Sequence, residues 1–133
     1  MSASGTFTLQ KEERICSKKL IERLFNGGNS HAVTAYPLKV VWTVVERESQ
    51  MPPVQILISV PKRCFKRAVK RNRVKRQVRE AFRKNKQTLI AQLSATPDRQ
   101  LVMAFIWQDE RLRESPSVDK KVIGLLERIG DSL

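Results

Sequence analysis

The first apolar pattern along the chain is helical. Gly27 and Gly28 mark the end of the predicted helix, because glycine is unfavourable inside a helix and commonly follows a helix end. We therefore predict a helix over residues 17–26, and we expect His31, just beyond it, to be a solvated loop residue. The apolar side chains of this helix are Leu20, Ile21, Leu24 and Phe25.

Two runs rich in β-branched residues come next. Residues 38–45 follow Pro37, and residues 54–60 follow a pair of prolines at 52–53. Both runs predict strands, and the segment between them is short enough for the two to pair as a hairpin with a long loop. Pro61 ends the second strand, because proline has no backbone N–H to donate to a neighbouring strand.

The second half of the chain returns to helical spacing. An apolar stripe predicts a helix over about residues 66–83, with a continuation to Leu93. The members of this stripe are Val74, Val78, Ala81 and Phe82. Residues 101–107 form a continuous apolar run, which is typical of a strand at the centre of a sheet. A further stripe predicts a helix from Ser115 to the end.

The predicted element order is therefore α-β-β-α-β-α. This order is typical of a mixed α/β (α+β) fold, arranged as a two-layer sandwich of helices on a sheet. With 133 residues and 41% apolar content, the chain is long enough to form one domain over residues 1–133 around its own core. We expect residues 1–10, most of which are small or polar, to be flexible.

Charge is distributed very unevenly along this chain. The formal charge is +13, from 26 Lys and Arg against 13 Asp and Glu. Residues 62–86 hold thirteen of the basic residues and one acid, Glu80, so this segment carries +12 and the other 108 residues carry +1. A nearly neutral domain with one concentrated cationic element is typical of a protein that binds a polyanion.

The alternative is that these cations only solvate a helix face. In a solvated helix, opposite charges normally meet four residues apart. Here nearly every such pair is like-charged, as in Arg71/Lys75 and Arg79/Arg83, and each like-charged pair costs roughly a few tenths of a kcal/mol unless an anion is bound. Arginine also predominates, and its planar guanidinium fits phosphate and stacks on bases. We therefore favour polyanion binding.

Among polyanions, RNA suits this helix better than a membrane surface or DNA. A membrane-surface helix exposes large apolar side chains beside its cations, whereas the apolar stripe here is needed for the core. Helix-turn-helix domains that read DNA are all-helical, whereas three predicted strands accompany this helix. RNA is recognised largely through shape and phosphate geometry. We expect an RNA partner, with no membrane and no DNA.

Composition excludes several other classes of protein. No run of about 18 apolar residues exists, which argues against a helical membrane span, and the first residues lack a secretory-signal pattern. Cys16 and Cys64 lie 48 positions apart and, with His31 as the one histidine, do not make a standard zinc site. We expect both cysteines to be buried or half-buried thiols of a cytoplasmic protein.

The sequence shows no hydrolytic site. Acid–base catalysis needs paired carboxylates or a histidine in a dry pocket. Asp109 and Glu110 are adjacent, so on a strand they would point to opposite faces, and the acids at 12–13, 46 and 48 lie near the ends of predicted elements. We therefore predict no catalytic and no metal-ligating residue in this chain.

The basic segment carries a pattern known from one family. Residues 67–83 read RAVKRNRVKRQVREAFR, and residues 58–63 read ISVPKR. The first stretch resembles the Arg-Asn-Arg signature of the bacterial ribonuclease P protein subunit, whose usual form is A-V-x-R-N-R-[IV]-K-R-x-x-R-E-x-F-R. The second resembles that family's strand end and basic pair. The resemblance extends over most of the chain, from the first helix to the last.

The resemblance implies a protein cofactor of an RNA enzyme. In this family the catalytic RNA removes the 5′ leader from precursor tRNA with the help of Mg²⁺, and the protein binds that RNA and holds the leader. The implied partners are the catalytic RNA and the precursor tRNA leader, with no obligate protein partner. The implied fold is a ribosomal-protein-like sandwich with a left-handed β-α-β crossover.

The resemblance also implies two sets of site residues. Matching motif positions and their basic neighbours would contact the catalytic RNA: Lys62, Arg63, Arg67, Lys70, Arg71, Asn72, Arg73, Lys75, Arg76 and Arg79. A cleft between the first helix and the sheet would hold the leader, with Arg71 and Asn72 also facing it. Phe25 matches an aromatic of that cleft, whereas Ile21 stands where a second would be. The aromatic of the first strand is either Trp42 or displaced to Val41.

Three other functions predict different results. A structural ribosomal or assembly protein would bind ribosomal RNA without affecting tRNA maturation. A protein-only nuclease would cut precursor tRNA with no RNA subunit present, and a DNA-binding repressor would show base-pair specificity on duplex DNA. Salt dependence does not separate these functions, because all of them neutralise phosphates.

Overall fold

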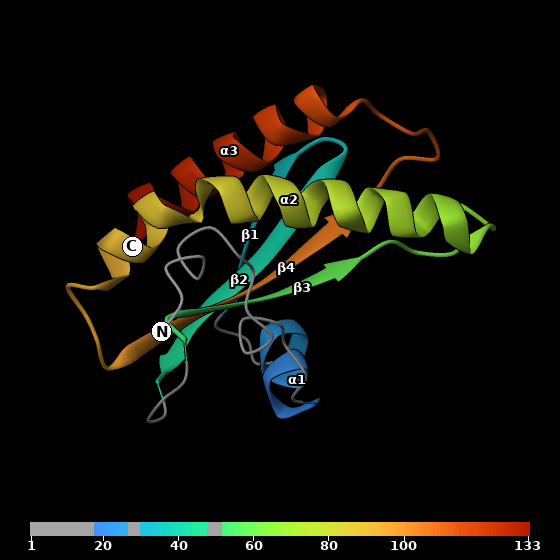
Figure 1. Cartoon of the computed structure of the whole chain (residues 1–133). Coiled ribbons are helices and arrows are strands. Elements are labelled where there is room, and N and C mark those ends of the chain that lie inside the picture. The colour runs from blue at the N-terminus through green and yellow to red at the C-terminus, as the bar shows by residue number, and fades with distance from the viewer. Residues whose placement is uncertain (1–17, 27–29, 48–51) are drawn as a thin grey trace, which may run out of the picture.

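A computed structural model describes residues 18–26, 30–47 and 52–133, which contain three helices and four strands. In chain order these are α1 (Lys18–Asn26), β1 (His31–Ala35), β2 (Leu38–Glu46), β3 (Val54–Ser59), α2 (Ala68–Leu93), β4 (Arg99–Trp107) and α3 (Ser115–Ser132). The strands form one sheet, with α2 and α3 on one face and α1 on the other (Figure 1). The expected α+β class is confirmed. Residues 1–10 and Cys16 lie outside the described residues.

The order of strands in the sheet is β1-β2-β4-β3. β4 pairs antiparallel with β2 and parallel with β3, so it is a central strand, as its continuous apolar run predicts. The predicted hairpin between residues 38–45 and 54–60 is wrong, because β4 lies between those two strands. A parallel pair needs a long crossover connection, and α2 supplies it between β3 and β4. The hand of this crossover stays a prediction.

β1 is the element that the sequence pattern did not reveal, so the observed order is α-β-β-β-α-β-α. It has five residues, lies at an edge of the sheet, and leaves most of its side chains exposed, which removes the apolar alternation that marks a strand. The turn to β2 contains a cis peptide bond between Tyr36 and Pro37. The expectation that His31 is a loop residue is wrong: it begins β1, and its exposed ring stacks on Trp42 with 4.5 Å between centroids.

The two faces of the sheet carry two separate apolar clusters, because strand side chains alternate between faces. The larger cluster joins the sheet to α2 and α3 and includes Trp42, Met103 and Phe105. The smaller cluster joins Leu24 of α1 to Val45, Val102 and Ala104. β4 contributes to both clusters, so it fixes the two layers of helices relative to each other.

The apolar stripe of α2 is buried as its spacing predicts. Val74, Val78, Ala81 and Phe82 are each 0% exposed, and the Phe82 ring meets the edge of Phe105 with 6.2 Å between centroids. The helix continues to Leu93, also as predicted. This packing decides which side of α2 is left for solvent.

Candidate nucleic-acid interface

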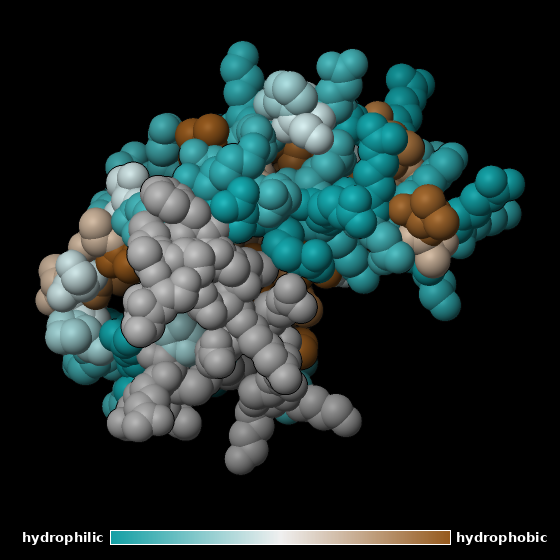
Figure 2. All heavy atoms as spheres, in the orientation of Figure 1, coloured by the Kyte–Doolittle hydropathy of each residue, from teal (hydrophilic) through white to brown (hydrophobic). Residues whose placement is uncertain are grey.

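α2 and the segment before it present most of the predicted RNA-binding residues to solvent. Because the apolar stripe of α2 faces the sheet, its opposite side faces outward, and hydrophilic side chains gather there (Figure 2). Seven of the ten predicted residues are exposed: Lys62, Arg63, Arg67, Lys70, Asn72, Arg73 and Arg76. The other three, Arg71, Lys75 and Arg79, are half-buried. We refer to the seven exposed residues as the basic face.

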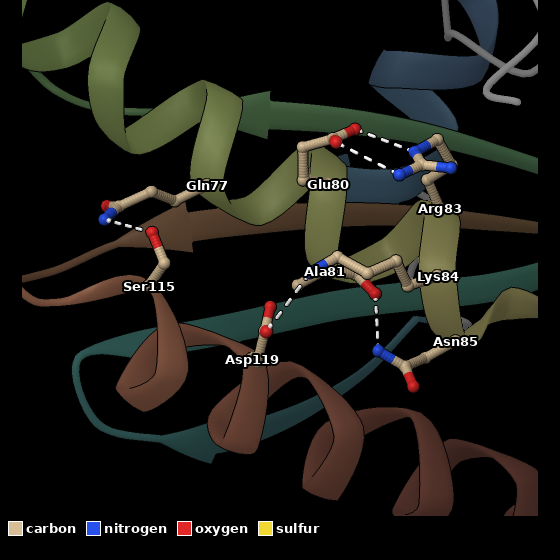
Figure 3. Close-up of polar contacts among 8 residues, drawn as sticks. All are labelled: Gln77, Glu80, Ala81, Arg83, Lys84, Asn85, Ser115 and Asp119. Carbon is tan, nitrogen blue, oxygen red and sulfur yellow. Dashed lines mark hydrogen bonds and ion pairs between the residues drawn. The ribbon is translucent and has the colours of Figure 1, made fainter.

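Two ion pairs lie in the second half of α2. Glu80 accepts hydrogen bonds from Arg83, with 2.8 Å between Oε2 and Nε, and Lys84 approaches Asp119 of α3 at 3.5 Å (Figure 3). The hydrogen bonds from Arg83 and the nearby cations lower the pKa of Glu80 despite its partial burial, so Glu80 is ionised at neutral pH. The basic face lies outside both pairs, so its charge is concentrated toward the start of the helix.

Arg71 acts inside the protein as well as toward solvent. Its Nη1 atom donates hydrogen bonds to the carbonyl oxygens of Phe65 and Lys66, at 2.8 and 2.9 Å. These bonds tie the segment before α2 to the first turns of the helix. Arg71 is therefore a positioning residue for the basic face, in addition to a predicted contact for RNA.

The segment that carries Lys62 and Arg63 is anchored by its apolar neighbours. Cys64 and Phe65 are buried, at 8% and 5% exposure, and the Cys64 thiol donates to the carbonyl oxygen of Trp107 at 3.7 Å. The expected burial of the Cys64 thiol is confirmed. Anchoring residues 64 and 65 in the core leaves the two preceding cations at the end of the sheet where β4 finishes.

The connection from β4 to α3 lies at the same end and adds cations that the sequence analysis missed. Asp109, 8% exposed, accepts hydrogen bonds from Arg113 Nε and Nη2 at 3.0 and 2.9 Å, and from the backbone N–H of Arg111 at 3.2 Å. Gln77 of α2 donates to the carbonyl oxygen of Arg113 at 2.8 Å. Acids and bases are mixed over residues 108–114, so no charge run marks this loop in the sequence.

Asp109 should make stability sensitive to acid. Burial raises its pKa, but the hydrogen bonds from Arg113 and Arg111 outweigh burial and hold the pKa below its usual value. The unfolded chain therefore takes up this proton first as the pH falls, and the stabilisation present above about pH 4 is lost below it. We expect Asp109→Asn to cost about 1.5–3 kcal/mol at pH 7 and to lose less stability than the wild type between pH 5 and 3.

Urea unfolding at several pH values measures this effect. Glu110→Gln is the matched control, because Glu110 is exposed beside Asp109, and its change should stay within about 0.5 kcal/mol. Equal acid sensitivity in the wild type and Asp109→Asn would show that the Asp109–Arg113 contact does not stabilise the fold.

The predicted leader-binding residues do not share one cleft. Trp42 points to the face of the sheet that α2 and α3 cover, and it is 5% exposed. α1 lies on the opposite face, where Ile21 and Val41 pack on the smaller apolar cluster. The assignment of Trp42 to a cleft with α1 is therefore wrong, since a one-residue shift along a strand reverses the face. Val41, the alternative position, lies on the α1 side of the sheet, as does Val45 of the same strand.

Phe25 keeps the exposure that a stacking residue needs. It is 45% exposed, whereas Leu24 beside it is fully buried against the sheet. Arg71 and Asn72 belong to the first turns of α2, in the other layer of the fold. The α1 side of the sheet and the start of α2 are thus candidate surfaces on two different layers.

Neither a metal cluster nor a membrane-spanning helix occurs in the part of the chain that the structure describes. No group of three or more His, Cys, Asp or Glu side chains is placed there to hold a metal ion. No helix of that part is long and apolar enough to cross a membrane.

Comparison with known proteins gives a consistent result. A family model described as Ribonuclease P matches residues 9–104. The ribonuclease P protein component of Porphyromonas gingivalis is 37% identical over 135 aligned residues, which cover 100% of this chain and 94% of that protein.

Two solved structures have the same fold. The RNase P protein from Thermotoga maritima aligns with a TM-score of 0.61 at 24% identity, over 87% of this chain and 96% of that one. A mutant RNase P protein of Staphylococcus aureus with defective mRNA degradation activity aligns with a TM-score of 0.64 at 17% identity, over 97% and 98% of the two chains.

Proposed function

The chain belongs to the ribonuclease P protein family, and from this premise we propose that it binds the catalytic RNA and the 5′ leader of precursor tRNA in the cytoplasm. As a ribonuclease P protein component, the chain is part of a tRNA-processing ribonucleoprotein. Its partner in that particle is the ribonuclease P RNA. The observation that best supports direct RNA binding is the basic face, whose seven predicted site residues are all exposed and lie between positions 62 and 76.

The chemistry of the basic face suits an RNA backbone. Its cations repel one another along the start of α2, and phosphates bound between them would relieve that repulsion. Arg67, Arg73 and Arg76 carry guanidinium groups that donate paired hydrogen bonds to phosphate oxygens. Arg71 holds the preceding segment in place, so Lys62 and Arg63 are ordered before RNA arrives, which lowers the entropy cost of binding.

The α1 side of the sheet is our candidate for the leader. The leader is single-stranded, so its bases are free to stack on an aromatic side chain, at about 1–3 kcal/mol per base. Phe25 offers such a ring at 45% exposure, while Ile21 and Val41 offer only an apolar surface beside it. A single stacking platform predicts a leader site of modest affinity on this side.

We assign the cleavage chemistry to the RNA subunit. Phosphodiester hydrolysis needs an activated water and neutralisation of developing charge, which bound Mg²⁺ supplies. Asp109, the one buried carboxylate among the described residues, is held by Arg113 and Arg111. In this proposal the chain contributes binding and orientation, and phosphates of the catalytic RNA hold the Mg²⁺.

The direct test is 5′ processing of a precursor tRNA at low Mg²⁺, with the catalytic RNA from the same organism, with and without this protein. We expect the protein to stimulate processing by at least about tenfold, which corresponds to about 1.4 kcal/mol of added binding or transition-state stabilisation. The protein without the catalytic RNA is the control, and we expect it to leave the precursor uncut.

Other outcomes would favour the alternative functions. No stimulation together with tight binding to ribosomal RNA would favour a ribosomal or assembly role. Cleavage by the protein alone would favour a protein-only nuclease, and sequence-specific binding to duplex DNA would favour a repressor.

A further inference from the structure

Tyr36 is an exposed aromatic residue at the end of the sheet where α2 begins. It lies in the turn between β1 and β2 and is 54% exposed. In Figure 1 this turn and the β4–α3 connection lie near the same end of the sheet as the start of α2. Among the Phe, Tyr and Trp residues that the structure describes, Phe25 and Tyr36 are the two exposed ones, and Phe25 lies on α1.

Arg113 supports the Tyr36 ring. The guanidinium carbon of Arg113 lies 5.7 Å from the ring centroid, and Asp109 fixes the guanidinium through two hydrogen bonds to Oδ2. The turn itself is held because the backbone N–H of Gln108 donates to the carbonyl oxygen of Pro37 at 2.8 Å. The ring is therefore held in place on a scaffold, while the residue as a whole stays more than half exposed.

The same scaffold connects Tyr36 to the basic face. Gln77 donates from Nε2 to the carbonyl oxygen of Arg113 and also reaches Ser115 Oγ at 3.2 Å (Figure 3). Lys70 and Arg73 precede Gln77 by seven and four residues, so they lie on the same row of the helix. An RNA strand bound along that row would pass beside the β4–α3 connection and the Tyr36 ring.

Acidic groups near Tyr36 decide which part of RNA the site would take. Glu110 and Glu114 are exposed on the β4–α3 connection, whereas the charge of Asp109 is offset by Arg113. Arg111 is exposed on the same connection, but two carboxylates accompany it, so the connection has no excess of positive charge to attract phosphates. A nucleobase is neutral, and its flat face suits an exposed ring backed by a cation.

We propose that Tyr36, supported by Arg113, is a stacking platform for one unpaired base of the RNA bound along Lys70 and Arg73. The inference rests on the proposed function and deepens it, by adding a base contact to a surface otherwise built for phosphates. The base belongs to the catalytic RNA or to precursor tRNA, and both sources share the same chemistry.

Two substitutions test the platform. Tyr36→Ala should weaken RNA binding about 5- to 100-fold, the range expected for loss of one stacked base, whereas Tyr36→Phe should bind within about twofold of the wild type. The slope of log affinity against log salt should stay unchanged in Tyr36→Ala, because no phosphate contact is removed. Separate titrations with the catalytic RNA alone and with precursor tRNA alone identify the source of the base.

Each outcome bears on the proposal. Wild-type affinity in Tyr36→Ala for both RNAs would overturn it, as would an equal loss in Tyr36→Phe, which would indicate a hydroxyl contact instead of stacking. If the wild type bound neither RNA, the proposed function itself would fail. Thermal melting checks the fold of each variant, and photocrosslinking of 4-thiouridine RNA to the wild type should recover a peptide that contains Tyr36. Absence of that crosslink would also contradict stacking.

Discussion

Replacing Arg73 and Arg76 together with glutamine should weaken binding to the catalytic RNA by about 100-fold or more. Both side chains are exposed, and a spacing of three residues puts them on one side of α2. A hydrogen bond to a charged group contributes about 1.5–3 kcal/mol, so two such contacts account for at least about 3 kcal/mol. Glutamine preserves helix propensity, so the loss reports on charge and not on folding.

Binding titrations at several salt concentrations measure this effect and its cause. Removing two phosphate contacts should reduce the salt slope by about 1.4, at about 0.7 per contact. Arg99→Gln with Lys120→Gln is the matched control, because these exposed cations lie at the start of β4 and on α3 and the same charge is removed. We expect that double variant to bind within about threefold of the wild type, since distant charges are screened. An equal loss in both double variants would show that binding follows net charge and not the basic face.

Phe82→Ala should lower the free energy of unfolding by about 3–5 kcal/mol, the range for truncating a buried phenylalanine. Phe82 is fully buried and joins α2 to Phe105 of the central strand β4. Because small domains are stable by only about 5–15 kcal/mol, this loss is a large part of the total. Urea unfolding followed by circular dichroism at pH 7 measures it.

Val69→Ala is the control for Phe82→Ala on the same helix. Val69 is 79% exposed, so its truncation should change the free energy of unfolding by no more than about 0.5 kcal/mol. A loss below about 1 kcal/mol in Phe82→Ala would mean that α2 does not depend on this contact to stay on the sheet. The basic face would then need another explanation for its fixed position.

The spacing of apolar residues predicted the secondary structure correctly wherever a long helix or strand buries its apolar side chains. The spacing of Val74, Val78 and Phe82 predicts both the existence of α2 and its buried side, because a helix must bury its apolar stripe to be stable. The continuous apolar run of β4 predicts a central strand for the same reason, since both of its faces are covered. Because the apolar stripe of α2 is buried, the cations on the opposite side of the helix are expected to be exposed.

Local sequence patterns did not predict which strands pair in the sheet. Which strand lies beside which depends on contacts between distant segments, and the short segment between β2 and β3 suggested a hairpin that the insertion of β4 rules out. The same limit applies to Trp42: its place on the α2 side or the α1 side depends on a register shift of one residue, which changes no local property of the run.

The sequence by itself determined the charge contrast, the three helices, the central strand and a motif long enough to indicate the ribonuclease P protein family. Each of these features depends on residues that are close together in the sequence, so the type and spacing of those residues are enough to predict it. Only the tertiary structure decided that Arg71 braces the segment before α2, that Trp42 is turned away from α1, and that Tyr36 and Arg113 meet beside the basic face. Tyr36 and Arg113 are 77 positions apart, and only the folding of β2 against β4 brings them together.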